Sequence, residues 1–174
     1  MTRLAAALLL ALALPGCGLR PLYAGGGSGP VAGLLRDVEV APIPDRSGWL
    51  MANALRDRLG AAGSARYRLD VRLDDQIQGF GVRRDDTVTR ERRTLRARYQ
   101  LVDLSNGSVV LDATAGSDAG IDVVQSEYAV IAAEDTALER LSNIVADEIV
   151  ARVALFARRR PAAQRSDDAG QPAR

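Results

Sequence analysis

The sequence predicts a two-layer α/β sandwich, with two helices packed on one face of a four-stranded, mostly antiparallel sheet. Three segments alternate apolar and polar residues with a period of two, which indicates strands with one buried and one solvated face. Two other segments repeat apolar residues every three or four positions, as amphipathic helices do. The order is strand, helix, three strands, helix, so two helices can cover the single apolar face of the sheet.

The first predicted strand is 38–41, and it ends there because the prolines that follow cannot donate hydrogen bonds to a strand ladder. The first helix is expected over 48–59, with Asp45 or Ser47 as its N-terminal cap. Its buried stripe is formed by residues that recur every four positions, namely Met51, Leu55 and Leu59.

The second and third predicted strands alternate regularly. In the second strand, which starts at Tyr67, the apolar residues stand at odd-numbered positions, but Phe80 and Val82 stand at even-numbered ones. We therefore expect a β-bulge near Gly79 that moves both side chains to the apolar face. The third strand runs over 87–104. Its apolar face is formed by Leu95, Ala97, Tyr99 and Leu101, and its polar face by Arg90, Arg92, Thr94, Arg96, Arg98 and Gln100.

A turn at 105–107 joins the third strand to the fourth. Residues paired across a hairpin share a face, so Leu101 should oppose an apolar residue. A two-residue loop would pair Leu101 with Asp112, whereas a three-residue loop pairs it with Leu111. We therefore expect a type I turn with Gly107 in the left-handed conformation, followed by a bulge. This register also pairs Tyr99 with Ala113 and Val102 with Val110.

The fourth strand is predicted over 109–116, with an extension through 121–123. The last element is a helix that begins at Tyr128 or Ala132 and ends at Phe156. Its apolar stripe steps by three or four positions along Leu138, Leu141, Val145, Ile149, Val153 and Phe156.

The composition excludes several kinds of catalytic site. The chain of 174 residues has no histidine and a single cysteine, and all its basic residues are arginine. It therefore lacks the nitrogen and sulfur ligands of a zinc site, a Ser-His-Asp triad and a phosphate-binding P-loop. We expect no enzyme activity, no cofactor and no metal. The 23 basic and 22 acidic residues nearly balance, so net charge gives no reason to expect a nucleic acid as partner.

The N-terminus has the parts of a secretory signal peptide over 1–16. A short basic start precedes an apolar run that is too short to span a membrane, and Gly16 comes directly before Cys17. The tetrapeptide at 14–17 resembles a bacterial lipobox, although Pro15 departs from the usual small or aliphatic residue. The resemblance implies that Cys17 carries the lipid, including palmitate, and that Gly18 directs the protein to the outer membrane. The alternative is a plain signal peptide with an incidental cysteine.

The rest of the chain divides into three parts. Residues 17–33 are expected to form the lipidated N-terminus and a flexible tether, because they include a glycine-rich run. The folded α/β domain is expected over 34–157, and residues 158–174 have too few apolar side chains to fold and are expected to be disordered.

A stripe of arginines on the third strand is the candidate contact surface. Like charges in a row repel one another unless an anionic group faces them, and arginine forks bind phosphate in a bidentate manner. The alternative is an ordinary solvated face neutralised by neighbouring acids. The stripe consists of Arg90, Arg92, Arg96 and Arg98, with Arg93 nearby and with Arg68 and Arg72 on the neighbouring strand.

The segment that follows the lipobox cysteine resembles the LptE family of lipopolysaccharide-assembly lipoproteins. Residues 17–23 read Cys-Gly-Leu-Arg-Pro-Leu-Tyr, which matches the start of mature members of that family. Residues 45–48, and the stretch from Tyr128 through 132–134 to 151–153, are similar to its alphaproteobacterial branch. Between 64 and 122 the similarity is one of pattern only.

The resemblance implies an outer-membrane lipoprotein that plugs the LptD β-barrel, helps to assemble it, and lies on the periplasmic side and in the barrel lumen. The partners implied are LptD, lipopolysaccharide and, through the lipid on Cys17, the outer membrane. The arginine stripe would then contact lipid A phosphates or acidic residues of the barrel wall. An auxiliary lipoprotein of an ABC-type lipid transport system is the alternative, and a purely structural envelope lipoprotein is a third.

Overall fold

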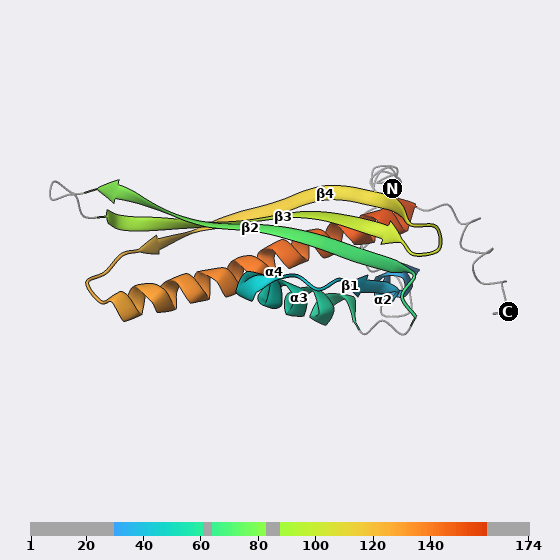
Figure 1. Cartoon of the computed structure of the whole chain (residues 1–174), viewed down its shortest axis with the longest axis horizontal. Coiled ribbons are helices and arrows are strands. Elements are labelled where there is room, and N and C mark those ends of the chain that lie inside the picture. The colour runs from blue at the N-terminus through green and yellow to red at the C-terminus, as the bar shows by residue number, and fades with distance from the viewer. Residues whose placement is uncertain (1–29, 61–63, 83–87, 160–174) are drawn as a thin grey trace, which may run out of the picture.

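The computed structural model describes residues 30–60, 64–82 and 88–159 (Figure 1). The predicted signal peptide, the predicted lipidation site Cys17 and residues 160–174 of the predicted tail lie outside these described residues.

A single four-stranded sheet with the strand order β1-β2-β3-β4 forms one layer. β1 pairs with β2 in parallel, and the pairs β2–β3 and β3–β4 are antiparallel, which confirms the predicted, mostly antiparallel sheet. The strands are β1 (Val38–Val40), β2 (Tyr67–Val82), β3 (Val88–Asp103) and β4 (Ser108–Asp122).

The helices form the second layer, on one face of the sheet, and the predicted sandwich is therefore confirmed (Figure 1). They are α2 (Pro30–Arg36), α3 (Asp45–Leu59) and α4 (Glu127–Arg159). α4 is the long central helix: it contacts β3, β4, α2 and α3. It begins near the predicted position and runs three residues beyond the predicted end at Phe156.

The core lies between the helices and the apolar face of the sheet, where α4 packs on β3 and β4 and α3 packs on β2. The alternating residues Leu95, Tyr99 and Leu101 of β3 are fully buried, as predicted. The Tyr67 ring packs edge-on against the Phe156 ring, with 6.4 Å between the ring centres. The fully buried residues of α4 include Val145, Ile149, Val153 and Ala154.

The helix α2 was not predicted. Residues 30–33, predicted as part of the tether, belong to this helix, and Val31, Leu34 and Leu35 are buried in the core. The helix is only seven residues long and contains Gly33, so its apolar pattern is too short to distinguish from a spacer. Within the described residues, the folded part therefore starts at Pro30, ahead of the predicted boundary at 34.

The β-bulge predicted near Gly79 is wrong. Gly79 pairs with Glu91 and Phe80 pairs with Arg90, in the same register that holds from Tyr67 onward. Phe80 therefore projects from the open face of the sheet, where the guanidinium of Arg92 lies 5.4 Å from the centre of its ring. The shift of the apolar residues to even-numbered positions therefore reflects an aromatic ring on the open face, over which the guanidinium of Arg92 stacks.

The hairpin between β3 and β4 agrees with the prediction in most respects. Leu101 pairs with Leu111, Tyr99 pairs with Ala113, and Gly107 has a φ of 72°. The predicted three-residue loop is wrong: Asp103 pairs with Ser108, so the loop has four residues, 104–107. The bulge is present, but Val102 pairs with Val109 and not with Val110, so Val110 is the extra residue. The loop closes through a hydrogen bond of 2.8 Å from the Gly107 N–H to the Asp103 carbonyl.

The start of α3 differs from the prediction. The helix begins at Asp45, which has a φ of 68°, and not at Gly48. Pro44 occupies the N-cap position and no side chain caps the helix by a hydrogen bond, so the predicted caps Asp45 and Ser47 are wrong. The loop before α3 instead packs tightly on the helix, because a Cβ at Gly48 would lie 2.6 Å from the Ile43 carbonyl oxygen.

This close approach predicts opposite effects for one substitution at two helical glycines. Gly33→Ala should stabilise the protein by up to about 1 kcal/mol, because alanine favours helix and a Cβ there meets nothing within 4 Å. Gly48→Ala should destabilise it despite the same helix preference, because backbone atoms must move. The free energy of unfolding from urea titration measures both. A stabilising Gly48→Ala would show that the approach of Ile43 is not a constraint.

Candidate functional site: the open face of the sheet

The sheet face opposite the helices is uncovered by any described element (Figure 1). Side chains on a strand alternate between the two faces of a sheet, and residues directly opposite each other on neighbouring strands point to the same face. The four arginines predicted as a stripe lie together on this open face, on alternate positions of β3. Arg68 and Arg72 of β2 share the face, because they pair with Val102 and Arg98.

Aspartates of β4 face most of this stripe. Arg90 lies 3.2 Å from Asp122 and Arg98 lies 3.1 Å from Asp112, measured between side-chain nitrogen and oxygen. Gln100 also donates to Asp112, at 2.8 Å, and the hydrogen bonds from Arg98 and Gln100 lower the pKa of the Asp112 carboxyl. The third such pair, Arg92 with Asp118, is wider at 3.8 Å.

Arg96 and Arg72 differ from the rest of the stripe. Arg68 of β2 pairs with Asp70 at 2.8 Å, but Arg72 and Arg96 form no ion pair within the part of the chain that the structure describes. Asp74 is directly opposite Arg96, and its carboxylate accepts a hydrogen bond of 3.1 Å from the Gln76 amide.

A hollow of about 440 Å³ opens beside these two arginines. Gly116 of β4 pairs with Arg96, and a Cβ at Gly116 would lie 3.2 Å from Arg96 Cγ, so the glycine leaves room for the arginine stem. Its lining is not confined to the open face, because Leu73, Ala97, Ala115 and Glu148 of α4 belong to the side of the sheet that the helices cover. The lining residues on the open face are Arg72, Asp74, Arg96, Arg98, Thr114 and Gly116. On that face the guanidinium groups of Arg72 and Arg96 offer hydrogen-bond donors to an anionic group such as a phosphate ester.

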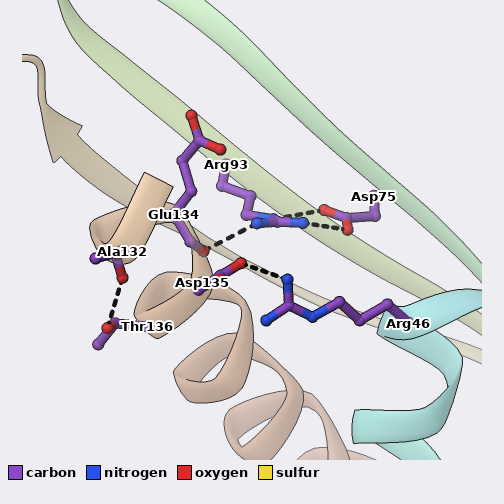
Figure 2. Close-up of polar contacts among 7 residues, drawn as sticks. All are labelled: Arg46, Asp75, Arg93, Ala132, Glu134, Asp135 and Thr136. Atoms are coloured by element: carbon purple, nitrogen blue, oxygen red, sulfur yellow. Dashed lines mark hydrogen bonds and ion pairs between the residues drawn. The ribbon is translucent and has the colours of Figure 1, made fainter. Parts of the chain in front are cut away.

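Arg93, the arginine adjacent to the stripe in sequence, lies on the other face and has a structural role (Figure 2). Its guanidinium donates two hydrogen bonds to Asp75 of β2, at 2.8 and 2.7 Å, and a third of 2.9 Å to the backbone carbonyl of Glu134. One residue further along α4, Asp135 accepts a hydrogen bond of 2.7 Å from Arg46 of α3. This network joins β2, β3, α3 and the first half of α4.

Two carboxyl groups approach one another beside this network. Burial raises the pKa of Glu134, and the negative charge of Glu91 on β3 raises it further. Arg93 opposes the increase, and Asp135 adds to it. One oxygen of Glu91 is buried without a hydrogen-bond partner among the described residues. The contact between the first half of α4 and the sheet therefore contains carboxyl groups that repel one another when both are ionised.

The described residues offer neither a metal centre nor a membrane span. No three His, Cys, Asp or Glu side chains within 30–60, 64–82 and 88–159 gather where they could hold a metal ion. Of the helices that the structure describes, none is both long and apolar enough to cross a membrane.

Comparison with known proteins identifies the family. Residues 35–153 match the model of the LptE family, which is described as lipopolysaccharide-assembly. The chain belongs to the LptE family. The resemblance noted in the sequence is therefore confirmed, and it places the protein among the lipoproteins of lipopolysaccharide assembly. No curated protein gives a significant match.

Solved structures of other bacterial lipoproteins share the LptE-type fold. A candidate lipoprotein from Caulobacter crescentus CB15 is 26% identical, with a TM-score of 0.63, and the match covers 76% of this chain and 99% of that one. The rare lipoprotein B from Shewanella oneidensis is 10% identical, with a TM-score of 0.54 and coverage of 68% and 93%. A minor lipoprotein from Acinetobacter baumannii is 13% identical, with a TM-score of 0.51 and coverage of 68% and 91%.

The facing carboxyl groups of Glu91 and Glu134 predict a pH-dependent stability. A pKa that is higher in the folded than in the unfolded chain means that stability is lost as pH rises through the folded value. The glutamine of Glu134→Gln is uncharged at every pH, so it is not repelled by Glu91. The free energy of unfolding of this variant should therefore exceed that of the wild type at neutral pH. The difference should shrink as pH falls below the ordinary glutamate value of 4.5.

Urea titrations from about pH 4 to about pH 7 would measure this difference. Glu139→Gln, at an exposed position of the same helix, is the matched control for the loss of one negative charge. A difference between Glu134→Gln and wild type that does not change with pH would contradict the expectation.

Proposed function

We propose that this LptE-family protein is an outer-membrane lipoprotein that plugs the LptD β-barrel and assists its assembly, so that lipopolysaccharide reaches the outer leaflet. The family match carries the proposal. The open face also supports it, because polar, charge-balanced side chains suit the polar interior of a large outer-membrane barrel. The protein acts by binding, with no catalytic step, and is anchored by a lipid on Cys17.

The surface around Arg72 and Arg96 is the part of the open face that we assign to lipid A phosphate. Arg90, Arg92 and Arg98 already face aspartates of their own sheet, so an incoming anion would compete with these carboxylates. Arg72 and Arg96 form no ion pair with a carboxylate among the described residues, and both project from the same face. Within the predicted stripe, Arg96 is therefore the primary phosphate contact, and Arg72 joins it.

Co-purification tests the plug. The tagged full chain, extracted in a mild detergent, should bring down a large outer-membrane β-barrel in equal stoichiometry, identified by mass. The Cys17→Ser variant controls for anchoring, because it should no longer incorporate palmitate. Recovery of an inner-membrane or periplasmic ABC-type transport complex in place of the barrel would overturn the plug proposal and favour the auxiliary-lipoprotein alternative.

Paired arginine substitutions test the phosphate contact. Arg72→Gln with Arg96→Gln should weaken lipopolysaccharide binding by about tenfold, and the loss should shrink at high salt, because exposed charges are screened. Arg90→Gln with Arg98→Gln is the matched control. It also removes two arginines from the open face, but both are held by aspartates. Equal losses in both double variants, or none in either, would show that Arg72 and Arg96 are not the phosphate site.

A further inference from the structure

The outer edge of β4 is an unpaired strand edge. β4 is the last strand of the sheet and pairs with β3 alone, and in Figure 1 it borders the sheet along its whole length. Among the described residues, no hydrogen bond reaches the backbone of 109–122 from outside the β3–β4 ladder. The edge therefore presents a row of backbone donors and acceptors to a neighbour.

This edge has few of the features that usually protect one. Natural sheets shield their edges with charged side chains, especially lysine, or with proline, bulges or very short strands. β4 has no proline and no basic residue, and its one irregularity, at Val110, comes early in the strand. From Leu111 to Asp122 the register is continuous. Side chains here are mostly small, including Ala113, Ala115, Gly116, Ser117, Ala119 and Gly120, so another backbone can approach.

The charge on this edge is acidic. Asp112, Asp118 and Asp122 all lie on the open face, since they pair with Gln100, Thr94 and Arg90 of β3. The side chains of Asp118 and Asp122 are 61% and 78% exposed, and their ion pairs with β3 are 3.8 and 3.2 Å long. Each carboxylate has lone pairs left to accept a second donor from the outer side.

We propose that the outer edge of β4 binds an extended segment of a partner protein that carries arginine or lysine residues four positions apart. The partner segment adds a fifth strand, so main-chain hydrogen bonds supply affinity and alternate side chains supply specificity. Asp118 and Asp122 set the spacing, because they are four residues apart on one face. The charges then alternate across the sheet, from basic β3 through acidic β4 to the basic segment.

A second copy of this chain fits the edge poorly. Antiparallel pairing of two β4 strands would bring six aspartates onto one face of the joint, three from each copy. A register that pairs Asp112 with Asp122 places like charges directly opposite, which destabilises cross-strand pairs. A basic segment meets the same carboxylates with opposite charge. This inference does not depend on the proposed phosphate contact at Arg72 and Arg96.

Binding of a designed peptide to the full chain in detergent tests the proposal. The probe is a fluorescent peptide of alternating threonine and valine with two arginines four positions apart. A peptide of the same composition with the arginines three apart, hence on opposite faces, is its control. The first peptide should bind by fluorescence anisotropy and should protect backbone amides of 111–122 from hydrogen exchange.

Reversing the charge of the β4 edge is the second test of the proposal. Asp118→Lys with Asp122→Lys should weaken binding of the arginine peptide by about tenfold, since two attractive cross-strand pairs become repulsive. Both positions are exposed, so the fold should persist. Binding should return when glutamates replace the arginines of the peptide. Glu139→Lys, on α4 and away from the edge, should leave binding unchanged.

Three results would overturn the proposal. The two arginine peptides could bind equally well, protection could fall outside β4, or the protein alone could form a concentration-dependent dimer with β4 protected. The last result would make a second copy the occupant of the edge.

Discussion

Burial of the apolar face of β3 and β4 against α4 is the interaction on which the rest of the structure depends. Leu95, Tyr99 and Leu101 of β3 are fully excluded from solvent, in one core cluster with Val145 and Ile149 of α4. Each large apolar side chain buried in this way contributes roughly 1.5–3 kcal/mol relative to exposure. Because the period of a strand is two, burying one set of side chains places all the alternate ones on the opposite face, where no described helix covers them.

The open face is therefore a necessary product of the fold, and its charges determine what it can do. Its ion pairs are exposed, and such pairs contribute little to stability. They can be exchanged for contacts with a ligand or a partner without loss of the core. The pairing is also uneven: aspartates of β4 hold Arg90 and Arg98, whereas Arg72 and Arg96 form no ion pair with any described residue.

The two ends of the molecule differ in construction. α2 packs on α4 at one end, and the long β2–β3 hairpin extends toward the other (Figure 1). Pro30, where α2 begins, lies 13 residues after Cys17. A fully extended chain of this length spans about 45 Å, so the proposed lipid on Cys17 would hold the domain near the bilayer by its α2 end. At the first half of α4, Arg93 secures the helix to the sheet, while the carboxyl groups of Glu91 and Glu134 oppose that contact.

Sequence alone determined the features that follow from local periodicity and local geometry. The alternation in β2 and β3, the apolar stripe of α4 and the pairing of Leu101 with Leu111 were all predictable, since the period of a strand or helix decides which side chains face the core. The heptapeptide at 17–23 likewise pointed to the LptE family, and the family match over 35–153 confirms it. Tertiary structure decided the rest. It placed α2 in the core, because a seven-residue helix is stable only when packed. It also decided which arginines are held by aspartates, because ion pairs across strands depend on register and side-chain reach, which a period of two does not specify.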